Sequence, residues 1–507
     1  MRSALMCLGY RWLLVAVLCL TGLAAVDREH AVADAAERQD HATLEKLLKQ
    51  GADVNAAQPD GATALQWAAH WDDAAAVEQL LRAKAAVNAA NDHGVTALAL
   101  ACENRSVIVV DKLLKAGANA NAVLSSGETV LMTASRTGHL GVLQALLAHG
   151  ARVNASEPAH NQTALMWAVA EQHPDIVRTL IAQGADIHAR SRVRRRTVQT
   201  GDRYGDQNSI KDVAQIDLGG FTPLLFAARV GDVASAEHLL RAGANVNDRA
   251  PNGASVLVVA AHSGAGRVAE LLLGNGAEPN DTGAGYSALH AAVLRGDLDL
   301  VKALLAHRAD PGARLTKGTS SRYYSKDYAF SEVLVGATPL WLAARYGESE
   351  MMRVLAAGGG DGRFAMADGT TTLMEAIIVT RGIGTFRAGD RRERYQGPAD
   401  VVAKADGEDE RITLETAKRA IELGADVRAV NKDGDTALHM AVALGLNRVV
   451  ELLANSGADL EARNNRGQTP LAAITARSSR APAGQYAGAV DESQSTADLL
   501  RKLGAKQ

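Results

Sequence analysis

The chain has 507 residues, a formal net charge of −3 and 47% hydrophobic residues. With 22% charged residues, this is the composition of a soluble folded protein. The near-neutral balance argues for neither a nucleic-acid-binding chain nor an acidic tail. Length alone suggests about three domains, an expectation that fails if the chain is one array of repeats.

The N-terminus has the pattern of a secretory signal peptide. Arg2 and Arg11 precede the apolar run 13–20, and small residues follow it as far as Ala24 and Ala25, after either of which we predict cleavage. The apolar stretch is shorter than the ~20 residues of a spanning helix, so an uncleaved anchor is the lesser alternative. We expect no stable membrane span after cleavage and a periplasmic or secreted protein.

Cysteine usage agrees with export into a bacterial envelope. Cys7 and Cys19 fall inside the predicted signal, which leaves Cys102 without an intramolecular disulfide partner in the mature chain. An exported protein without disulfides must rely on its apolar core, which favours a bacterial periplasm or exterior over eukaryotic secretion. Cys102 itself is predicted to be a buried, inert thiol.

The rest of the chain is built from a recurring pair of short motifs. TALQWAA begins at Thr63 and TALALAC at Thr96, 33 residues later, and variants recur down to TPLAAIT at Thr469. GADVN at Gly51 and its variants follow in the same phase. In the unit that begins at Thr436, the threonine can cap a first helix, Val449, Leu452 and Leu453 give a second helix its apolar stripe, and Gly457 suits the left-handed position after it.

These two motifs and their 33-residue period resemble the ankyrin repeat, from about Val26 to the C-terminus. The resemblance implies an all-α ankyrin-repeat solenoid of about 12 helix-turn-helix repeats with finger hairpins between them. One helix pair cannot bury its own apolar face, which explains why the units stack. In this family a histidine in the first motif ties neighbouring turns together. That histidine survives only as His290 and His439, so we expect lower local stability elsewhere.

The spacing is broken in three places. The step is 59 residues from Thr163 to Thr222, 51 from Ser287 to Thr338 and 65 from Thr371 to Thr436. The first two insertions lengthen fingers, and the third separates the two helices of one repeat. The predicted divisions are a signal peptide at 1–25, repeats 1–5 at 26–189, an arginine-rich finger at 190–219, repeats 6–8 at 220–311, a tyrosine-rich finger at 312–336, and repeats 9–12 at 337–507 with an inter-helix insertion at 381–410.

The fingers carry the side chains that favour binding. Surface insertions cost little free energy, so they need no function to persist. However, the three insertions hold seven of the 19 aromatic residues, and disordered filler is poor in aromatics. Arginine beside tyrosine suits an acidic protein surface or another anion. The alternative is that the finger arginines pair internally with Asp202, Asp206, Asp212 and Asp217, and both readings stay open.

The resemblance also implies a concave binding face made from finger tips and the exposed ends of first helices. Tryptophan, tyrosine and arginine are the residue types that anchor protein interfaces. The candidate partner-binding residues are Trp71, Arg136, Arg229, Arg345 and Tyr346 on the helices, and Arg192, Arg194, Arg195, Arg196, Tyr204, Tyr323, Tyr324 and Tyr328 in the fingers. Trp67, Trp167 and Trp341 lie inside the motifs and are assigned to the core.

Two short motifs resemble parts of catalytic or phosphate-binding sites, but neither is complete. The DTG triplet at Asp281 occupies a repeat turn and has no second copy, whereas an aspartic protease needs two carboxylates. The glycine-rich run at Gly358 lacks the lysine of a phosphate-binding loop. We therefore predict no catalytic residues, no metal ligands and no cofactor.

The sequence thus predicts a non-catalytic scaffold, exported from the cytoplasm, that binds a protein partner rather than nucleic acid. The partner is expected to have an acidic surface, and the protein is expected to be monomeric. A secreted effector that binds host proteins is one alternative. An enzyme or metal protein with its site in the insertions is the other.

Overall fold

The computed structural model describes residues 29–199, 213–319, 330, 332–378, 407–478 and 487–506. The predicted signal peptide, Tyr204, Tyr323, Tyr324 and Tyr328 lie outside these residues, as does most of the inter-helix insertion at 381–410.

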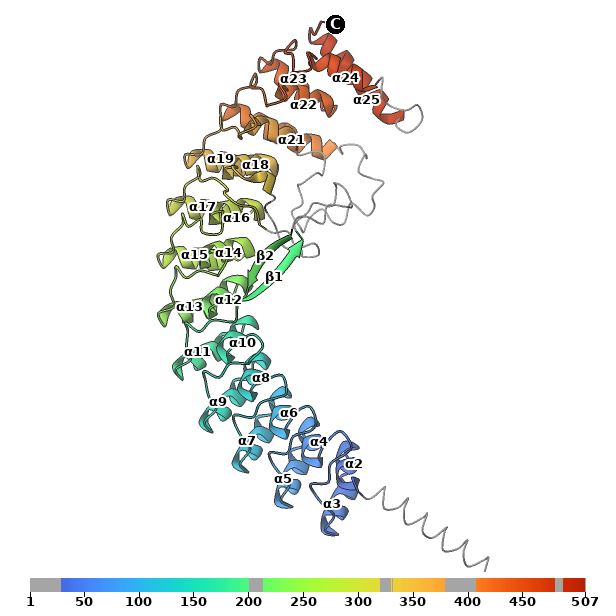
Figure 1. The fold of residues 1–507 in the computed structure, drawn as a ribbon, viewed down its shortest axis with the longest axis vertical. Helices are drawn as coiled ribbons and strands as arrows, with labels where there is room; N and C mark the ends of the chain where they lie inside the picture. The colour runs from blue at the N-terminus through green and yellow to red at the C-terminus, as the bar shows by residue number, and fades with distance from the viewer. Residues whose placement is uncertain are drawn as a thin grey trace, which may run out of the picture. The chain divides into compact units, whose positions relative to one another are not determined.

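The described chain forms twelve consecutive pairs of helices, as the repeat count predicts (Figure 1). In each pair a first helix of seven or eight residues is usually followed by a second of nine. The pairs are α2 (Ala31–Glu37) and α3 (His41–Lys49), α4 (Ala64–His70) and α5 (Ala74–Arg82), α6 (Ala97–Glu103) and α7 (Val107–Lys115), α8 (Val130–Thr137) and α9 (Leu140–Ala148), α10 (Ala164–Ala170) and α11 (Pro174–Ala182), α12 (Pro223–Val230) and α13 (Val233–Arg241), α14 (Val256–Ser263) and α15 (Gly266–Gly274), α16 (Ala288–Arg295) and α17 (Leu298–Ala306), α18 (Pro339–Arg345) and α19 (Ser349–Ala357), α20 (Thr372–Ile378) and α21 (Gly407–Glu422), α22 (Ala437–Ala443) and α23 (Asn447–Asn455), and α24 (Pro470–Ser478) and α25 (Ala487–Lys502).

The chain divides into two compact units. The first comprises residues 1–192, 220–227 and 234–244, and the second comprises 193–219, 228–233 and 245–507. Within each unit, first helices pack on first helices and second helices on second helices: α4, α6 and α8 follow one another in the first unit, as do α5, α7 and α9. Each unit is therefore two layers of short helices.

Local sequence explains where the helices begin and end. The side chain of Thr96 accepts a hydrogen bond from the amide of Ala99 at 3.2 Å and so caps α6. Ser106 caps α7 in the same way. Most second helices end before a glycine with positive φ, such as Gly117 at 92°, a conformation that costs other residues a steric penalty. After α5 and α17 this position is taken by Lys84 and Arg308.

The core lies between the helix layers. First helices contribute small residues, such as Ala101 and Cys102 of α6, and second helices contribute larger ones, such as Val110 and Leu113 of α7, all of which are buried. Small side chains on one layer let the next helix approach closely, and the branched residues of the other layer fill the remaining space. Each pair is thus covered by its neighbours in the stack.

An asparagine after each of several second helices joins one repeat to the next. Asn121 donates from its side-chain amide to the carbonyl of Gly150 at 3.0 Å and accepts from the amide of Arg152 at 2.8 Å. Asn88 and Asn154 make the same two bonds to the repeats that follow them. The last residue of the GADVN motif therefore pairs with the carbonyl of the glycine that follows the next second helix.

The histidine position of the first motif is also occupied by other donors. His290 donates from Nε2 to the carbonyl of Ala337 at 3.2 Å, just before the next repeat's cap. Gln66 makes the equivalent bond to Val95 at 2.7 Å, and the indole of Trp341 makes it to Thr370 at 3.3 Å. The expectation that the tie is lost without histidine is therefore wrong at these two positions. It still applies to Met132, Met166 and Leu225, whose side chains have no donor.

The first insertion is an antiparallel hairpin of β1 (Arg194–Gln199) and β2 (Val213–Leu218) between α11 and α12. The second contains a short 3-10 helix, Glu332–Leu334, and is closed at its base by Thr319 and Phe330. The Thr319 amide donates to the Phe330 carbonyl at 2.8 Å, and the Phe330 amide donates to the Thr319 hydroxyl at 2.6 Å. The third insertion separates α20 from α21, the two helices of one repeat.

Substitution of Asn121 tests the asparagine tie. Asn121→Ala removes both inter-repeat bonds, and we expect it to lower the free energy of unfolding by about 1–2 kcal/mol, because each bond contributes about 0.5–1.5 kcal/mol. Asn121→Asp retains the acceptor for Arg152 and is the matched control. Hydrogen exchange at the Arg152 amide should accelerate in the alanine variant and stay slow in the aspartate variant. Unchanged exchange in both variants would contradict the tie.

Substitution of His290 tests the buried donor. Burial lowers the pKa of His290 to about 4, from an ordinary value of 6.5, despite its bond to Ala337. A folded-state pKa below the unfolded one gives stability that is present above about pH 6.5 and lost as pH falls towards 4, in total roughly 3 kcal/mol.

His290→Gln should keep the bond, as Gln66 does, and remove this pH-dependent component. The measurement is the thermal midpoint between pH 7.5 and pH 4.5. His290→Met, which has no donor, should be destabilised across the whole range without that component. A glutamine variant with the full pH dependence of the parent would refute the assignment.

Candidate partner-binding surface

The C-terminal ends of the first helices form a recurrent surface, which we call the first-helix face. In the first unit it includes Trp71, Asn104, Arg136 and Glu171, at or next to the ends of α4, α6, α8 and α10. Trp71, Asn104 and Glu171 occupy equivalent positions in their repeats, and Arg136 lies one position earlier in its own repeat. Two of the four, Trp71 and Arg136, are sequence-predicted contact residues.

Side chains on this face bind the helix ends of the preceding repeat. Trp71 donates from its indole to the carbonyl of Glu37 at 3.0 Å, and Asn104 donates to the carbonyl of His70 at 2.6 Å. The Nε2 atom of His173 lies 3.1 Å from the carbonyl of Arg136. The last carbonyls of a helix have no partner inside it, and these side chains supply one. Part of the first-helix face is therefore structural, a role that sequence reasoning missed.

Trp71 nonetheless remains accessible. It is 44% exposed, and its ring lies 4.8 Å from that of His70 in an edge-to-face arrangement. Its indole bond fixes the ring and leaves apolar surface open to solvent, as expected of an aromatic contact residue. The core assignment is confirmed for Trp341, which is 3% exposed, whereas Trp67 and Trp167 are only half-buried.

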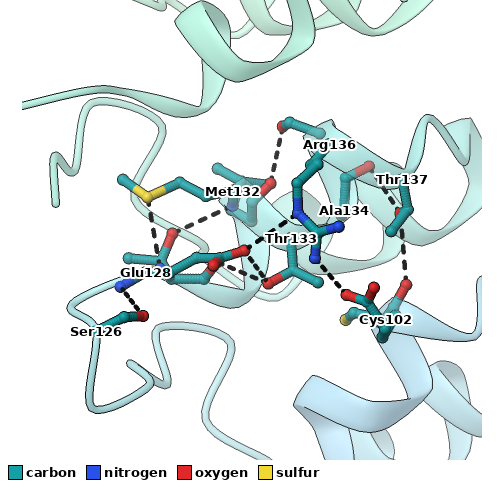
Figure 2. A network of polar contacts seen from close by, with 12 residues as sticks. Cys102, Ser126, Glu128, Met132, Thr133, Ala134, Arg136 and Thr137 are labelled. Atoms are coloured by element: carbon teal, nitrogen blue, oxygen red, sulfur yellow. Dashed lines mark hydrogen bonds and ion pairs between the residues drawn. The ribbon is translucent and has the colours of Figure 1, made fainter. Parts of the chain in front are cut away.

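Arg136 is the centre of a charged network in the first unit (Figure 2). Its Nη2 atom lies 2.5 Å from Glu103 Oε2, and its Nε atom lies 3.8 Å from Glu128 Oε1. The hydroxyl of Thr133 donates to Glu128 at 2.9 Å. Partial burial opposes the charged form of Arg136, but the Glu103 bond and the nearby carboxylates outweigh it and raise its pKa. Arg136 is thus held in place rather than free to extend.

In the second unit the predicted helix residues differ in accessibility. Arg229, in the last turn of α12, is exposed, and Tyr346, just after α18, is half-buried. Arg345 instead forms an ion pair with Glu375 of α20, in which the arginine side chain is 16% exposed and the carboxylate 4%. This position differs from the exposed anchor predicted for Arg345. Its guanidinium stabilises a buried acid on the next first helix.

The first strand of the hairpin carries the arginines from the start of the first insertion. Arg194, Arg195 and Arg196 are all exposed on β1. Arg195 pairs with Asp217 directly across the hairpin, with 3.1 Å between Nε and Oδ1, so the internal-pairing alternative is correct for this residue. Asp202, Asp206 and Asp212 lie outside the described residues.

Arg192, at the base of the first insertion, belongs to the first unit, and its side chain is exposed. Its backbone amide donates to the carbonyl of His160 at 2.5 Å, which fixes where the chain leaves the repeat.

The base of the second insertion is anchored by a buried aromatic cluster. Phe330 is fully buried, with ring centroids 5.0 Å from Tyr286, 6.5 Å from His262 and 6.4 Å from His290. Burial raises the pKa of Tyr286 to about 12. The four rings come from the insertion, a repeat turn and two first helices. Sequence analysis assigned residues 312–336 to a finger insertion but did not predict that Phe330 within it is buried.

Residues that could suggest chemistry have structural roles. Asp281 of the DTG triplet is buried and accepts a hydrogen bond from Arg249 Nε at 2.7 Å. Burial raises the pKa of the Cys102 thiol, which keeps it protonated. Across the described ranges, no group of three or more histidine, cysteine, aspartate or glutamate side chains is placed to hold a metal ion. No helix among the described residues is both long and apolar enough to span a bilayer.

The stacked helix pairs, their caps and the finger turns define a helical repeat protein. The family model for ankyrin repeats, in sets of three copies, matches residues 32–123, 108–191, 224–315 and 410–483. The matched segments cover more than half of the chain, which therefore belongs to the ankyrin repeat family. Ankyrin repeats are protein–protein interaction modules, and the fold is typically a non-enzymatic scaffold.

Relatives share parts of the array. Ankyrin repeat and SOCS box protein 16 of Homo sapiens is 29% identical over 250 residues, which cover 49% of this chain and 46% of that protein. The transient receptor potential cation channel subfamily A member 1 of Homo sapiens is 24% identical over 54% of this chain and 27% of its own length. An ankyrin repeat-containing protein of Treponema pallidum is 38% identical over 112 residues, which cover 22% of this chain and 38% of that protein.

The chain thus spans less than half the length of these relatives. The crystal structure of the human ASB11 ankyrin repeat domain aligns with 49% of this chain and 98% of its own, at 27% identity and a TM-score of 0.39.

Substitution of Arg345 tests the buried ion pair with Glu375, because the loss of stability should depend on pH. Burial raises the pKa of Glu375, and the Arg345 guanidinium opposes that rise without cancelling it. A raised folded-state pKa means that the contribution of this group to stability falls as pH rises above about 4.5. Arg345→Met removes the opposing charge, so it should cost about 3–5 kcal/mol at pH 7 and clearly less at pH 5.

Thermal midpoints at the two pH values measure this difference. Arg353→Met is the control, because it breaks the pair with Glu350 on α19, and an ion pair between two exposed side chains contributes little to stability. Equal losses in the two variants, or an Arg345→Met loss independent of pH, would disprove the role assigned to the buried pair.

Proposed function

We propose that the protein is an exported, non-catalytic scaffold that binds a protein partner through its first-helix faces and its arginine-bearing hairpin. The repeats supply a rigid frame, and the hairpin adds specificity for a partner with an acidic surface. The partner is a protein rather than nucleic acid, and the scaffold acts as a monomer. It works in the periplasm or outside the cell after its signal peptide is removed.

One observation supports binding by the hairpin above all. The array is interrupted between α11 and α12 by a two-stranded ribbon with three consecutive exposed arginines. Two of these charges, Arg194 and Arg196, have no ion-paired or hydrogen-bonded side-chain partner among the residues that the structure describes. A positive ribbon on a chain of net charge −3 is a local feature, which suits recognition of a local acidic surface.

The first-helix face supports binding by the repeats. Trp71 combines a fixed ring with accessible apolar surface, and Arg229 is an exposed cation at the equivalent end of α12. Arg136 and Arg345 are ion-paired with glutamates. Their side chains therefore contribute to the charge of the first-helix face but are not free to move towards a partner. We therefore rank Trp71, Arg194 and Arg196 above the other predicted contacts.

The proposal can be tested by photo-crosslinking in the native host. A photoreactive residue replaces Trp71 on the first-helix face or Thr197 on β1, and Ile108, an exposed residue of α7 on the second-helix side, is the matched control. We expect one recurrent protein adduct at Trp71 or Thr197 and none at Ile108. Equal adducts at all three positions, or no protein adduct at any of them, would refute the scaffold.

Cell fractionation of the same strains tests the proposed export. Recovery of the shortened chain from the periplasmic fraction is the expected result. Recovery from the culture medium would favour the secreted-effector alternative, and recovery of the full-length chain from the cytoplasm would contradict export.

A further inference from the structure

The hairpin is a two-stranded sheet with unused hydrogen-bonding capacity. Within the described ranges, β1 and β2 pair only with each other, and no described helix packs extensively on either strand. The outward edge of each strand therefore has backbone donors and acceptors for which the described sheet has no third strand. An isolated two-stranded hairpin is only marginally stable in water, so an added strand would stabilise it.

The strand register assigns the three arginines to different faces. Arg195 lies opposite Asp217, and the two side chains form an ion pair on their shared face. Arg194 and Arg196 lie opposite Leu218 and Ile216, on the other face. Side chains alternate between faces along a strand, so Arg194 and Arg196 are neighbours roughly 6.7 Å apart. The face they share has two positive charges and no opposing acid at the directly paired positions of β2.

This arrangement matches one kind of ligand better than others. An extended peptide repeats its side chains on one face every two residues, with the same roughly 6.7 Å spacing as Arg194 and Arg196. Acidic residues at alternate positions would thus meet both arginines in register. The Arg195–Asp217 pair shows the required geometry inside the protein, since an aspartate directly across a strand pair reaches the guanidinium at 3.1 Å.

We propose that an extended protein segment with acidic residues at alternate positions adds to the outer edge of β1 as a third strand. Its backbone pairs with β1, and two of its carboxylates pair with Arg194 and Arg196. This inference rests on the proposed scaffold function and names the part of the partner that the hairpin recognises. Arg195 does not contact this segment, because its guanidinium is ion-paired with Asp217 on the other face of the hairpin.

The first test measures binding of labelled peptides to the intact protein by fluorescence polarisation at low salt. The probe is a decapeptide that alternates threonine and glutamate. One control has the same composition with its glutamates grouped together, and another has N-methylated amides on its hydrogen-bonding edge. We expect the alternating peptide to bind at least about tenfold more tightly than either control, because only it offers both the charge spacing and the backbone donors.

Substitutions on β1 test whether Arg194 and Arg196 are the residues that contact the peptide. Arg194→Ala and Arg196→Ala should each weaken binding about threefold, and the double variant about tenfold, as expected for cross-strand charge pairs. The double variant Arg178→Ala/Arg241→Ala is the matched control. It removes two exposed charges from α11 and α13 and should leave the affinity within about twofold.

Charge reversal separates recognition from folding. Arg194→Glu/Arg196→Glu should lose the glutamate peptide and gain the corresponding threonine–lysine peptide, which an unfolded hairpin could not do. Loss of the glutamate peptide without that gain would overturn the proposal. So would equal binding of the grouped peptide or the N-methylated peptide, or tighter binding of a single-stranded oligonucleotide of equal charge.

Failure of the third-strand contact and failure of the scaffold proposal give different results. A protein adduct at Trp71 that persists in the Arg194→Glu/Arg196→Glu variant, with no peptide binding, would leave the scaffold intact and remove the third-strand contact. Peptide binding without any cellular adduct at Trp71 or Thr197 would do the reverse.

Discussion

The structure depends on the burial of each helix pair against the next. A pair such as α6 and α7 places Cys102, Val110 and Leu113 on faces that only neighbouring repeats can cover. Apolar burial of this kind contributes about 25 cal/mol per Å², and no single repeat has enough internal surface to fold on it. Stability therefore accumulates along the stack, and interruptions are tolerated only where they leave the contact between neighbouring pairs in place.

Polar ties add geometric definition to this apolar stacking. Asparagines such as Asn121 connect the ends of second helices, whereas Trp71 and Asn104 connect the ends of first helices. Each tie pairs with a backbone carbonyl at or just beyond a helix end of the adjacent repeat, so the register between repeats is fixed at both edges. The same device limits the binding surface, because a side chain that holds a neighbouring helix end has fewer ways to adapt to a partner.

The insertions use this frame in different ways. The second insertion is anchored by Phe330 in a ring cluster with Tyr286, His262 and His290, so its base belongs to the core. The first is a ribbon that the described helices barely touch, and its arginines are divided between an internal pair and an accessible face. An anchored base suits presentation of a loop, whereas a ribbon with open edges suits pairing with another chain.

Sequence periodicity determined the class of fold, the number of helix pairs and the places where the array is interrupted, because short-range patterns decide helix ends and apolar faces. It also placed Trp341 and Cys102 in the core. Only the tertiary structure decided which arginines are available: Arg345 is paired with Glu375, Arg195 with Asp217, and Arg194 and Arg196 lie on the other face of β1. The physical reason is that a charge's partner can lie in another repeat or across a strand, at a separation that local sequence patterns do not encode.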